Sequence, residues 1–283
     1  EKKVIIALWG PQGRGKTTTL RKLALEFLDS PEVKEDIQIG FLFGKKKIVV
    51  STAENDQVNT SFCGELGAHV LVKARRGKEL GEECAQRIIV HADLIGEVGT
   101  DEKQEPVSGV QVVNDVQVVN DLISSIANNN EITMLRQFSL ELLKSDVVKG
   151  DIQIAFHYKG KRIVISTAGD DKGTVDEGKN LFKALKADIL VTATRSGGYS
   201  RKALKDLEED GEIKTKAIRI YKSDLTHGEP NDEIHNESLK ESITKEQIET
   251  LKELINEGQA KILKTAIDLI IDKWEEQSED SPS

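Results

Sequence analysis

The sequence predicts an α/β protein with a largely parallel sheet, built as two tandem copies of one unit that each add an antiparallel hairpin. Three observations lead to this prediction: a long internal repeat, short apolar runs that alternate with helical patterns, and a glycine-rich loop between an apolar run and a helical run. Residues 20–53 (LRKLALEFLDSPEVKEDIQIGFLFGKKKIVVSTA) align without gaps on residues 135–168 (LRQFSLELLKSDVVKGDIQIAFHYKGKRIVISTA), and 19 of the 34 positions are identical. Chance does not produce such agreement, so we interpret the repeat as a duplication.

Each copy carries the same series of elements. A helix is predicted near Leu20 and near Leu135, because apolar residues recur there at helical spacing. A hairpin follows, with the strands IQIGFLF and KIVVSTA in copy one and IQIAFHY and RIVISTA in copy two. A short helix, a buried strand (HVLVKA or DILVTA), a charged helix and a last strand complete the copy. Short apolar runs that alternate with helices indicate a parallel sheet, to which the hairpin adds one antiparallel strand.

The repeat divides the chain into four parts. We expect a nucleotide-binding copy over residues 1–99, a linker and connecting helix over 100–132, a second copy over 133–230, and a C-terminal helix and tail over 231–283.

The C-terminal part carries a helical pattern of its own. Apolar residues recur every three or four positions from Ile248 to Leu269, which predicts an amphipathic helix. Thr244 with Gln247 is typical of a capping box at its start, and the tail from Glu275 is expected to fray.

Composition restricts the classes of function. The formal net charge of -9 is spread along the chain and argues against a broad nucleic-acid-binding face, so we do not expect nucleic acid as a partner. No apolar run approaches the roughly 20 residues that span a bilayer, so no membrane partner is expected. Cys63 and Cys84 have no metal-ligand spacing, and the apolar run from Val4 to Trp9 is too short for a signal peptide. A cytoplasmic protein is the expectation.

The glycine-rich loop has the spacing of a phosphate-binding loop. GPQGRGKT, from Gly10 to Thr17, fits GxxxxGK[ST], follows the apolar run VIIALW and precedes a helical run. In this motif the backbone amides surround phosphate oxygens, Lys16 bridges the terminal phosphates, and Thr17 places its hydroxyl on Mg²⁺. The alternative is a plain glycine turn at the end of a strand. The predicted binding residues are Gly10, Pro11, Gln12, Gly13, Arg14, Gly15, Lys16, Thr17 and Thr18.

The second copy does not keep this loop. The same alignment places Asn130 opposite Gly15 and Glu131 opposite Lys16. A carboxylate at the position of the ammonium group would repel a phosphate. The second copy is therefore expected to provide structural support, to contact a partner, or to complete the site of the first copy.

The order of elements resembles that of P-loop NTPases, and among them of Ras-like GTPases. In that group the second hairpin strand ends in DTAG and a later strand ends in NKxD. Here the hairpins end in STAEND (Ser51–Asp56) and STAGDD (Ser166–Asp171), and the late strands end in HADL and YKSDL. The resemblance covers most of each copy by the order of its elements, but only the phosphate loop by an intact motif.

The altered motifs suggest a modified metal site. The resemblance implies that Thr17 binds Mg²⁺ and that Ser51, in place of the family's Asp, holds a metal-bound water. Glu54 or Asp56, a few residues further on, would supply the missing carboxylate. Lys16, Glu54, Asp56 and Arg195 are thus the candidate catalytic residues.

The base-recognition motif is altered as well. His91 and Ala92 replace its Asn and Lys in copy one, and Tyr221 and Lys222 occupy these positions in copy two. Asp93 and Asp224 match the family's Asp, but a turn or cap residue after a strand is an equal interpretation. Guanine specificity is not supported, and ATP is favoured over GTP only on its abundance.

Arginines follow the predicted strands that precede the charged helices. Arg75 and Arg76 follow one strand, Arg195 follows its counterpart, and Arg201 comes one helical turn later. An arginine beside glycines at a strand end suits an anion, although surface arginines in a loop are an equally good interpretation. Arg195 or Arg201 would act as an internal arginine finger.

Three functions fit these features. The first is a switch protein that binds and hydrolyses Mg·ATP or Mg·GTP and passes its state to a protein partner through the second copy or the C-terminal helix. The second is a small kinase-like phosphotransferase, and the third is a binding module that uses the nucleotide without chemistry.

Overall fold

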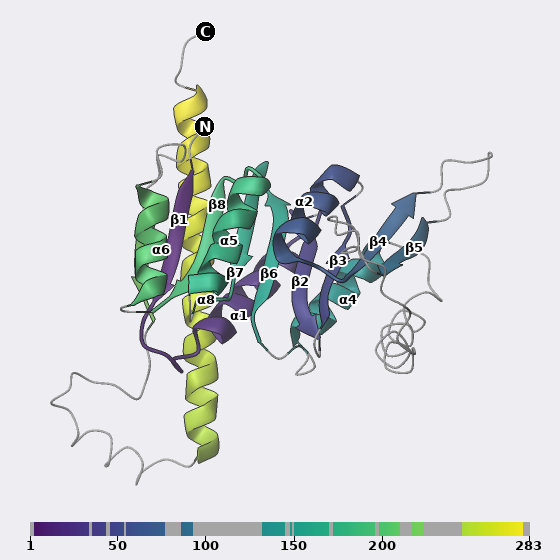
Figure 1. Cartoon of the computed structure of the whole chain (residues 1–283). Helices are drawn as coiled ribbons and strands as arrows, with labels where there is room; N and C mark the ends of the chain where they lie inside the picture. The colour runs from purple at the N-terminus through teal and green to yellow at the C-terminus, as the bar shows by residue number, and fades with distance from the viewer. Residues whose placement is uncertain are drawn as a thin grey trace, which may run out of the picture. The chain divides into compact units, whose positions relative to one another are not determined.

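The computed structural model of the chain (Figure 1) is an α/β structure with a mixed, mostly parallel sheet arrangement. It describes residues 3–33, 36–43, 46–53, 55–76, 86–92, 132–144, 148, 150–169, 172–195, 198–209, 217–222 and 245–279. The chain forms two compact units, with Glu1–Lys34 and Asp151–Ser283 in unit 1 and Glu35–Gly150 in unit 2.

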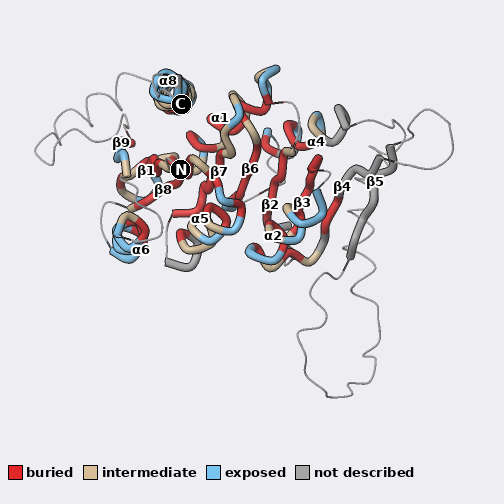
Figure 2. Tube along the Cα trace, turned by 90° about the horizontal axis from the view of Figure 1, so that it is seen from above, coloured by how far each residue is buried: buried red, intermediate tan, exposed pale blue. Residues whose placement is uncertain are grey.

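Unit 1 is a five-stranded sheet with the strand order β6-β7-β8-β1-β9. Figure 2 shows α1 and α8 on one face of this sheet and α5 and α6 on the other. Only the hairpin β6–β7 is antiparallel; β7, β8, β1 and β9 run parallel to one another. Its elements are β1 (Val4–Trp9), α1 (Lys16–Leu28), β6 (Ile152–Tyr158), β7 (Lys161–Ser166), α5 (Lys172–Ala184), β8 (Ile189–Thr194), α6 (Tyr199–Glu208), β9 (Ala217–Tyr221) and α8 (Lys245–Glu279).

Unit 2 is a four-stranded sheet with the strand order β5-β4-β3-β2. Among the described residues, helices α2 and α4 accompany it, and α4 packs against β3 and β4. Its elements are β2 (Gln38–Phe43), β3 (Lys46–Ser51), α2 (Asp56–Leu66), β4 (Val70–Arg76), β5 (Gln86–Ala92) and α4 (Ile132–Lys144).

The helices that precede the two hairpins are exchanged. Helix α1, which precedes the first hairpin in the sequence, packs against β6, β7 and β8, whereas α4, which precedes the second hairpin, packs against β3 and β4. Strand β1 inserts between β8 and β9, with Ile5 paired to Leu190 on one side and to Ala217 on the other. The compact units therefore differ from the predicted division into residues 1–99 and 133–230, because the apolar side chains of β1 are buried in the sheet that contains β8 and β9.

The two hairpins pair in the same register but differ in one buried contact. Gln38 lies opposite Ser51 in β2–β3, and Gln153 lies opposite Ser166 in β6–β7. In unit 2 the amide oxygen of Asn59 accepts hydrogen bonds from Ser51 Oγ at 2.6 Å and from Gln38 Nε2 at 3.1 Å.

In unit 1 a glycine lies against the corresponding pair. A Cβ atom on Gly178 would lie 2.8 Å from the Ser166 Cβ atom, so α5 approaches the sheet more closely than an Asn side chain would allow. Within the described residues, the Ser166 hydroxyl and the Gln153 amide make no hydrogen bond.

Two expectations about the elements were wrong. Strand β5 runs antiparallel to β4, whereas a parallel strand was predicted. The connection over residues 77–85 is shorter than the dozen or more residues that a parallel crossover needs. Helix α8 continues to Glu279, beyond the expected fraying point at Glu275, and in this last part the Ser278 hydroxyl donates to the carbonyl of Trp274 at 2.6 Å.

The predicted charged helix between β4 and β5 and most of the predicted linker lie outside the described residues. In the described part of the chain, no helix combines the length and the apolar character that crossing a membrane requires.

Candidate phosphate-binding site

The predicted loop lies where β1 ends and α1 begins. The backbone N–H of Gly10 donates to the carbonyl of Thr194 at 3.2 Å, which holds the start of the loop beside the end of β8. Gly13 and Gly15 have φ values of 76° and 73°, in the left-handed region that favours glycine. The chain can therefore curl between the strand and the helix and leave the first amides of α1 without helical partners.

Lys16 folds back over this loop. Its side chain is buried, with 6% of the residue exposed. The ammonium group donates to the carbonyls of Gly10 at 3.0 Å and Pro11 at 2.7 Å. The loop thus holds a positive charge against its own backbone, beside the positive end of the α1 dipole.

A cavity of about 320 Å³ opens at this loop. The loop side of the cavity runs from Gln12 to Thr17, and three residues of the neighbouring strands complete it: Thr167, Gly169 and Ala193. Backbone amides, a buried ammonium group and a hydroxyl therefore line one cavity, and this is a set of donors suited to an oxyanion.

The hairpin of the second repeat completes the cavity. The Thr17 hydroxyl donates a long hydrogen bond, 3.5 Å, to the carbonyl of Thr167. Gly169 passes so close to β8 that a Cβ atom on it would lie 2.3 Å from the carbonyl oxygen of Ala193. The segment STAG at the end of β7 therefore borders the loop from Gly10 to Thr17.

Arg195, one of the candidate catalytic residues, lies beside the loop. Its guanidinium group donates from Nη2 to Gln12 Oε1 at 3.0 Å. Its backbone N–H donates to Ser200 Oγ at 3.0 Å, which fixes the chain between β8 and α6. A second cation is therefore joined by a hydrogen bond to Gln12, a neutral residue of the cavity lining.

The end of β9 borders the other side of the loop. The backbone N–H of Lys222 donates to the carbonyl of Trp9 at 2.9 Å, and the Lys222 residue is buried. The rings of Trp9 and Tyr221 meet edge to face at 4.9 Å between centroids. We did not predict a role for Lys222; its place after the last strand, as the counterpart of a family lysine, was the available signal.

Helix α8 packs against α1, next to the loop. Thr19 Oγ1 donates to Asn256 Oδ1 at 3.1 Å, and both residues are buried. A Cβ atom on Gly15 would lie 3.1 Å from the same amide oxygen. Lys22 on α1 pairs with Glu257 at 3.3 Å, so α8 is tied to the first two turns of the phosphate-loop helix.

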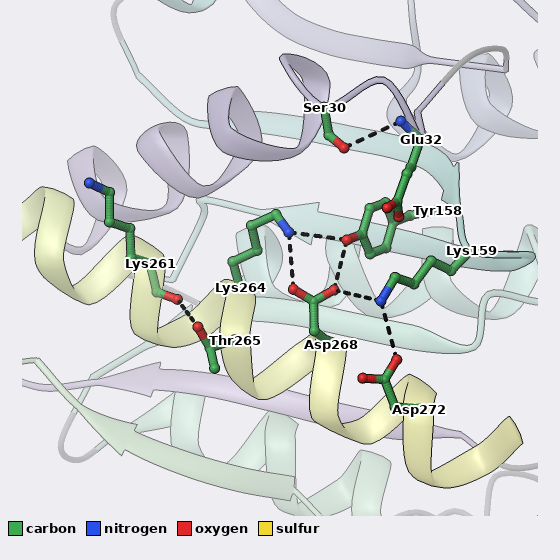
Figure 3. A network of polar contacts seen from close by, with 9 residues as sticks. All are labelled: Ser30, Glu32, Tyr158, Lys159, Lys261, Lys264, Thr265, Asp268 and Asp272. Carbon is green, nitrogen blue, oxygen red and sulfur yellow. Dashed lines mark hydrogen bonds and ion pairs between the residues drawn. The ribbon is translucent and has the colours of Figure 1, made fainter. Parts of the chain in front are cut away.

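A second set of polar contacts ties α8 to β6 (Figure 3). Tyr158 donates to Asp268 Oδ1 at 2.7 Å, and Lys264 Nζ donates to the other carboxylate oxygen at 3.0 Å. Burial opposes ionisation of Asp268, but these two hydrogen bonds and the nearby ammonium groups outweigh it, so the pKa of Asp268 lies below its usual value. Burial and the neighbouring carboxylate raise the pKa of Tyr158 well above its usual value, so Tyr158 remains a hydrogen-bond donor.

Two residues predicted for the metal and catalytic roles belong to unit 2. Ser51 is fully buried there, where its hydroxyl donates to Asn59, and Asp56 occupies the first turn of α2, where a carboxylate stabilises the helix dipole. Neither residue is among those that line the cavity. Because β1 pairs with β8 and β9, the loop is completed by residues 167 and 169 and not by the first hairpin. Glu54 lies outside the described residues.

The other candidates are distributed as follows. Thr18 is exposed on the first turn of α1, and Arg201 lines a different pocket, between α6 and β9. Arg75 and Arg76 end β4, and their side chains lie outside what the structure describes, as do Asp93 and Asp224.

The cavity offers few groups to a divalent cation. Thr17 supplies a hydroxyl, and the described lining residues include no carboxylate. In the described ranges, no three or more His, Cys, Asp or Glu residues form a group that could hold a metal ion. The chain continues after Gly169 with Asp170 and Asp171, which lie outside the described residues.

Comparisons of the chain with protein-family models, curated proteins and solved structures found no match. Its function must therefore be inferred from the residues of the site.

Proposed function

We propose that unit 1 binds the triphosphate of a nucleotide, with Mg²⁺, on the loop from Gly10 to Thr17, and hydrolyses it as a molecular switch. The observation that carries this proposal is the buried Lys16 ammonium group, held across a loop whose amides and hydroxyl face one cavity. Phosphate oxygens are stronger acceptors for an ammonium group than the backbone carbonyls of Gly10 and Pro11 are.

Different residues of the cavity would contact different phosphates of the nucleotide. The amides from Gly13 to Thr17 would hold the inner phosphates, and Lys16 would move from the carbonyls to the terminal phosphate oxygens. Arg195 would leave Gln12 and neutralise charge that develops on the terminal phosphate.

A magnesium ion fits this site only in part. The Thr17 hydroxyl would hold the ion together with the phosphates, and the ion would neutralise phosphate charge there. Ser166 stands where the GTPases that the sequence resembles carry a carboxylate, so Asp170 or Asp171 would be the nearest source of one in the sequence. ATP is favoured over GTP only by its abundance.

Helix α8 is our candidate for the element that reads the nucleotide state. Asn256 accepts a hydrogen bond from Thr19 and lies beside Gly15, so a shift of the loop on binding would displace Asn256 and with it α8. We interpret the two hairpins as products of one duplication; the loop from Gly10 to Thr17 precedes the first hairpin in the sequence but belongs with the second hairpin to unit 1.

A binding module without chemistry is the second candidate. The lack of a carboxylate among the described lining residues favours it, because hydrolysis would then lack both a metal anchor and a group to orient water.

The test is titration of the protein with ATP and GTP, with and without Mg²⁺, by calorimetry. We expect Lys16→Ala to weaken binding by about 10- to 100-fold, since it removes hydrogen bonds from a charged group worth about 1.5–3 kcal/mol. Lys261→Ala, the same change on an exposed position of α8, is the matched control. Equal affinity in all three proteins would refute the site.

Turnover separates the two candidates. Hydrolysis that falls in Arg195→Ala while affinity changes less would support the switch. Tight binding with no turnover in the wild-type protein would support the binding module.

A further inference from the structure

A second pocket in unit 1 has a strongly basic lining. It lies between α6 and β9, has a volume of about 550 Å³, and is lined by four cations and one carboxylate in addition to Gly198. The cations are Arg201, Lys202, Lys205 and Arg219, and the carboxylate is Glu208. This is a local excess of positive charge on a chain whose formal net charge is -9.

The ion pairs of the pocket leave part of this charge uncompensated. Arg219 pairs with Glu208 at 2.6 Å, and Lys205 pairs with Glu209 at 3.3 Å. Arg201 and Lys202 are exposed on the first turn of α6, and neither forms an ion pair with any residue that the structure describes. The positive end of the α6 dipole lies at the same turn.

An exposed aromatic ring stands at the same end of the helix. Tyr199 is the first residue of α6 and is 75% exposed, which is unusual for a ring of its size. It follows Gly198, which lines the pocket. Cations that hold a backbone beside an exposed ring on which a base can stack are the usual parts of a site for single-stranded nucleic acid.

We propose that the pocket between α6 and β9 binds single-stranded nucleic acid, with phosphates on Arg201 and Lys202 and a base stacked on Tyr199. The exposed ring favours this ligand over a phosphopeptide or an anionic lipid surface, which need cations but no stacking platform. The proposal does not rest on nucleotide binding at the phosphate loop, because the two pockets share no lining residue. It also departs from the expectation drawn from net charge, since α6 places three cations within five residues and β9 adds a fourth.

The experiment is fluorescence anisotropy of a labelled oligothymidylate without a 5′ phosphate, titrated with full-length protein over a series of salt concentrations. Binding to single strands weakens with log[salt] by a slope of about 0.7 per phosphate contact. Arg201→Gln with Lys202→Gln removes two contacts, so we expect the slope to shrink by about 1.4 and affinity at low salt to fall on the order of tenfold. Tyr199→Ala should weaken binding several-fold at an unchanged slope, because it removes stacking and no charge.

The control variants change residues that do not line this pocket. Lys261→Gln with Lys273→Gln removes the same charge from exposed positions of α8 and should bind as the wild type does, as should Lys16→Ala. No binding at the lowest salt, or an equal loss in the α8 control, would overturn the proposal. Binding of heparin, a phosphopeptide or anionic vesicles without binding of the oligonucleotide would assign the pocket to another polyanion and overturn it as well.

Discussion

Replacing Gly169 by alanine tests whether the close contact between residue 169 and β8 shapes the phosphate cavity. The added Cβ atom would lie 2.3 Å from the carbonyl oxygen of Ala193, 2.5 Å from its carbonyl carbon and 2.7 Å from its Cβ atom. These distances are about 1 Å shorter than ordinary contacts. Two of the three atoms belong to the backbone of a buried strand and have no alternative rotamer, so the segment from Thr167 to Gly169 must move away from β8.

The cost of this movement follows from the size of the clash. Overpacking by one methyl group costs about 1–3 kcal/mol, and we expect the upper end because backbone has to shift. Gly258→Ala is the matched control, since a Cβ atom there meets nothing within 4 Å and lies inside α8. A glycine in an exposed helix interior is about 1 kcal/mol less favourable than alanine, so the control should stabilise the protein by that amount.

Urea denaturation of both variants provides the measurement, and nucleotide titration provides a second one. Because residue 169 lines the cavity, Gly169→Ala should also weaken nucleotide binding, whereas Gly258→Ala should leave it unchanged. A Gly169→Ala protein with the stability and affinity of the wild type would refute the close approach of residue 169 to β8, and with it the shape of the cavity.

Three further predictions concern the polar contacts. Asn59→Ala breaks the hydrogen bonds of Asn59 with Gln38, Ser51 and Ala53, so it should lower the free energy of unfolding by about 2–4 kcal/mol in urea titrations. A loss below about 1 kcal/mol would contradict the buried network. Asn256→Ala leaves Thr19 without its acceptor, so calorimetry should show weaker nucleotide binding than in the wild type but a smaller loss than in Lys16→Ala; an unchanged affinity would separate α8 from the loop. The pKa of Asp268 is lower in the folded protein, so the Asp268 carboxylate stabilises the fold above the unfolded pKa near 3.8, and this stabilisation is lost as the pH falls through the folded pKa. The free energy of unfolding should therefore decline less steeply in acid for Asp268→Asn than for the wild type. Parallel pH profiles of the two proteins would refute the contact.

Much of the local structure could be predicted from the residues alone. The apolar run of β1 and the motif from Gly10 to Thr17 predicted a strand, a loop and a helix because both depend on neighbours in the sequence. The hairpins followed from apolar runs joined by short turns, and the helical period from residue 248 predicted α8.

The partners of these elements depended on tertiary structure. Nothing in the sequence of β1 distinguishes the end of β3 from the end of β7 as the segment that borders the loop, because STA occurs in both repeats. The sequence therefore led us to Ser51 and Asp56, whereas the structure gathers Thr167 and Gly169. Strand pairing decided this, since β1 is buried between β8 and β9.

The sequence thus determined the local structure of the loop from Gly10 to Thr17, and the fold determined which residues surround it. A loop motif is local: glycines at positions 13 and 15 permit the turn, and a lysine at position 16 reaches back over it, whatever sheet the strand joins. The contacts of Arg195 with Gln12 and of Asn256 with Thr19 join residues 183 and 237 positions apart. Separations of that size are bridged only when packing of the apolar faces brings distant strands and helices together, and no spacing in the sequence encodes them.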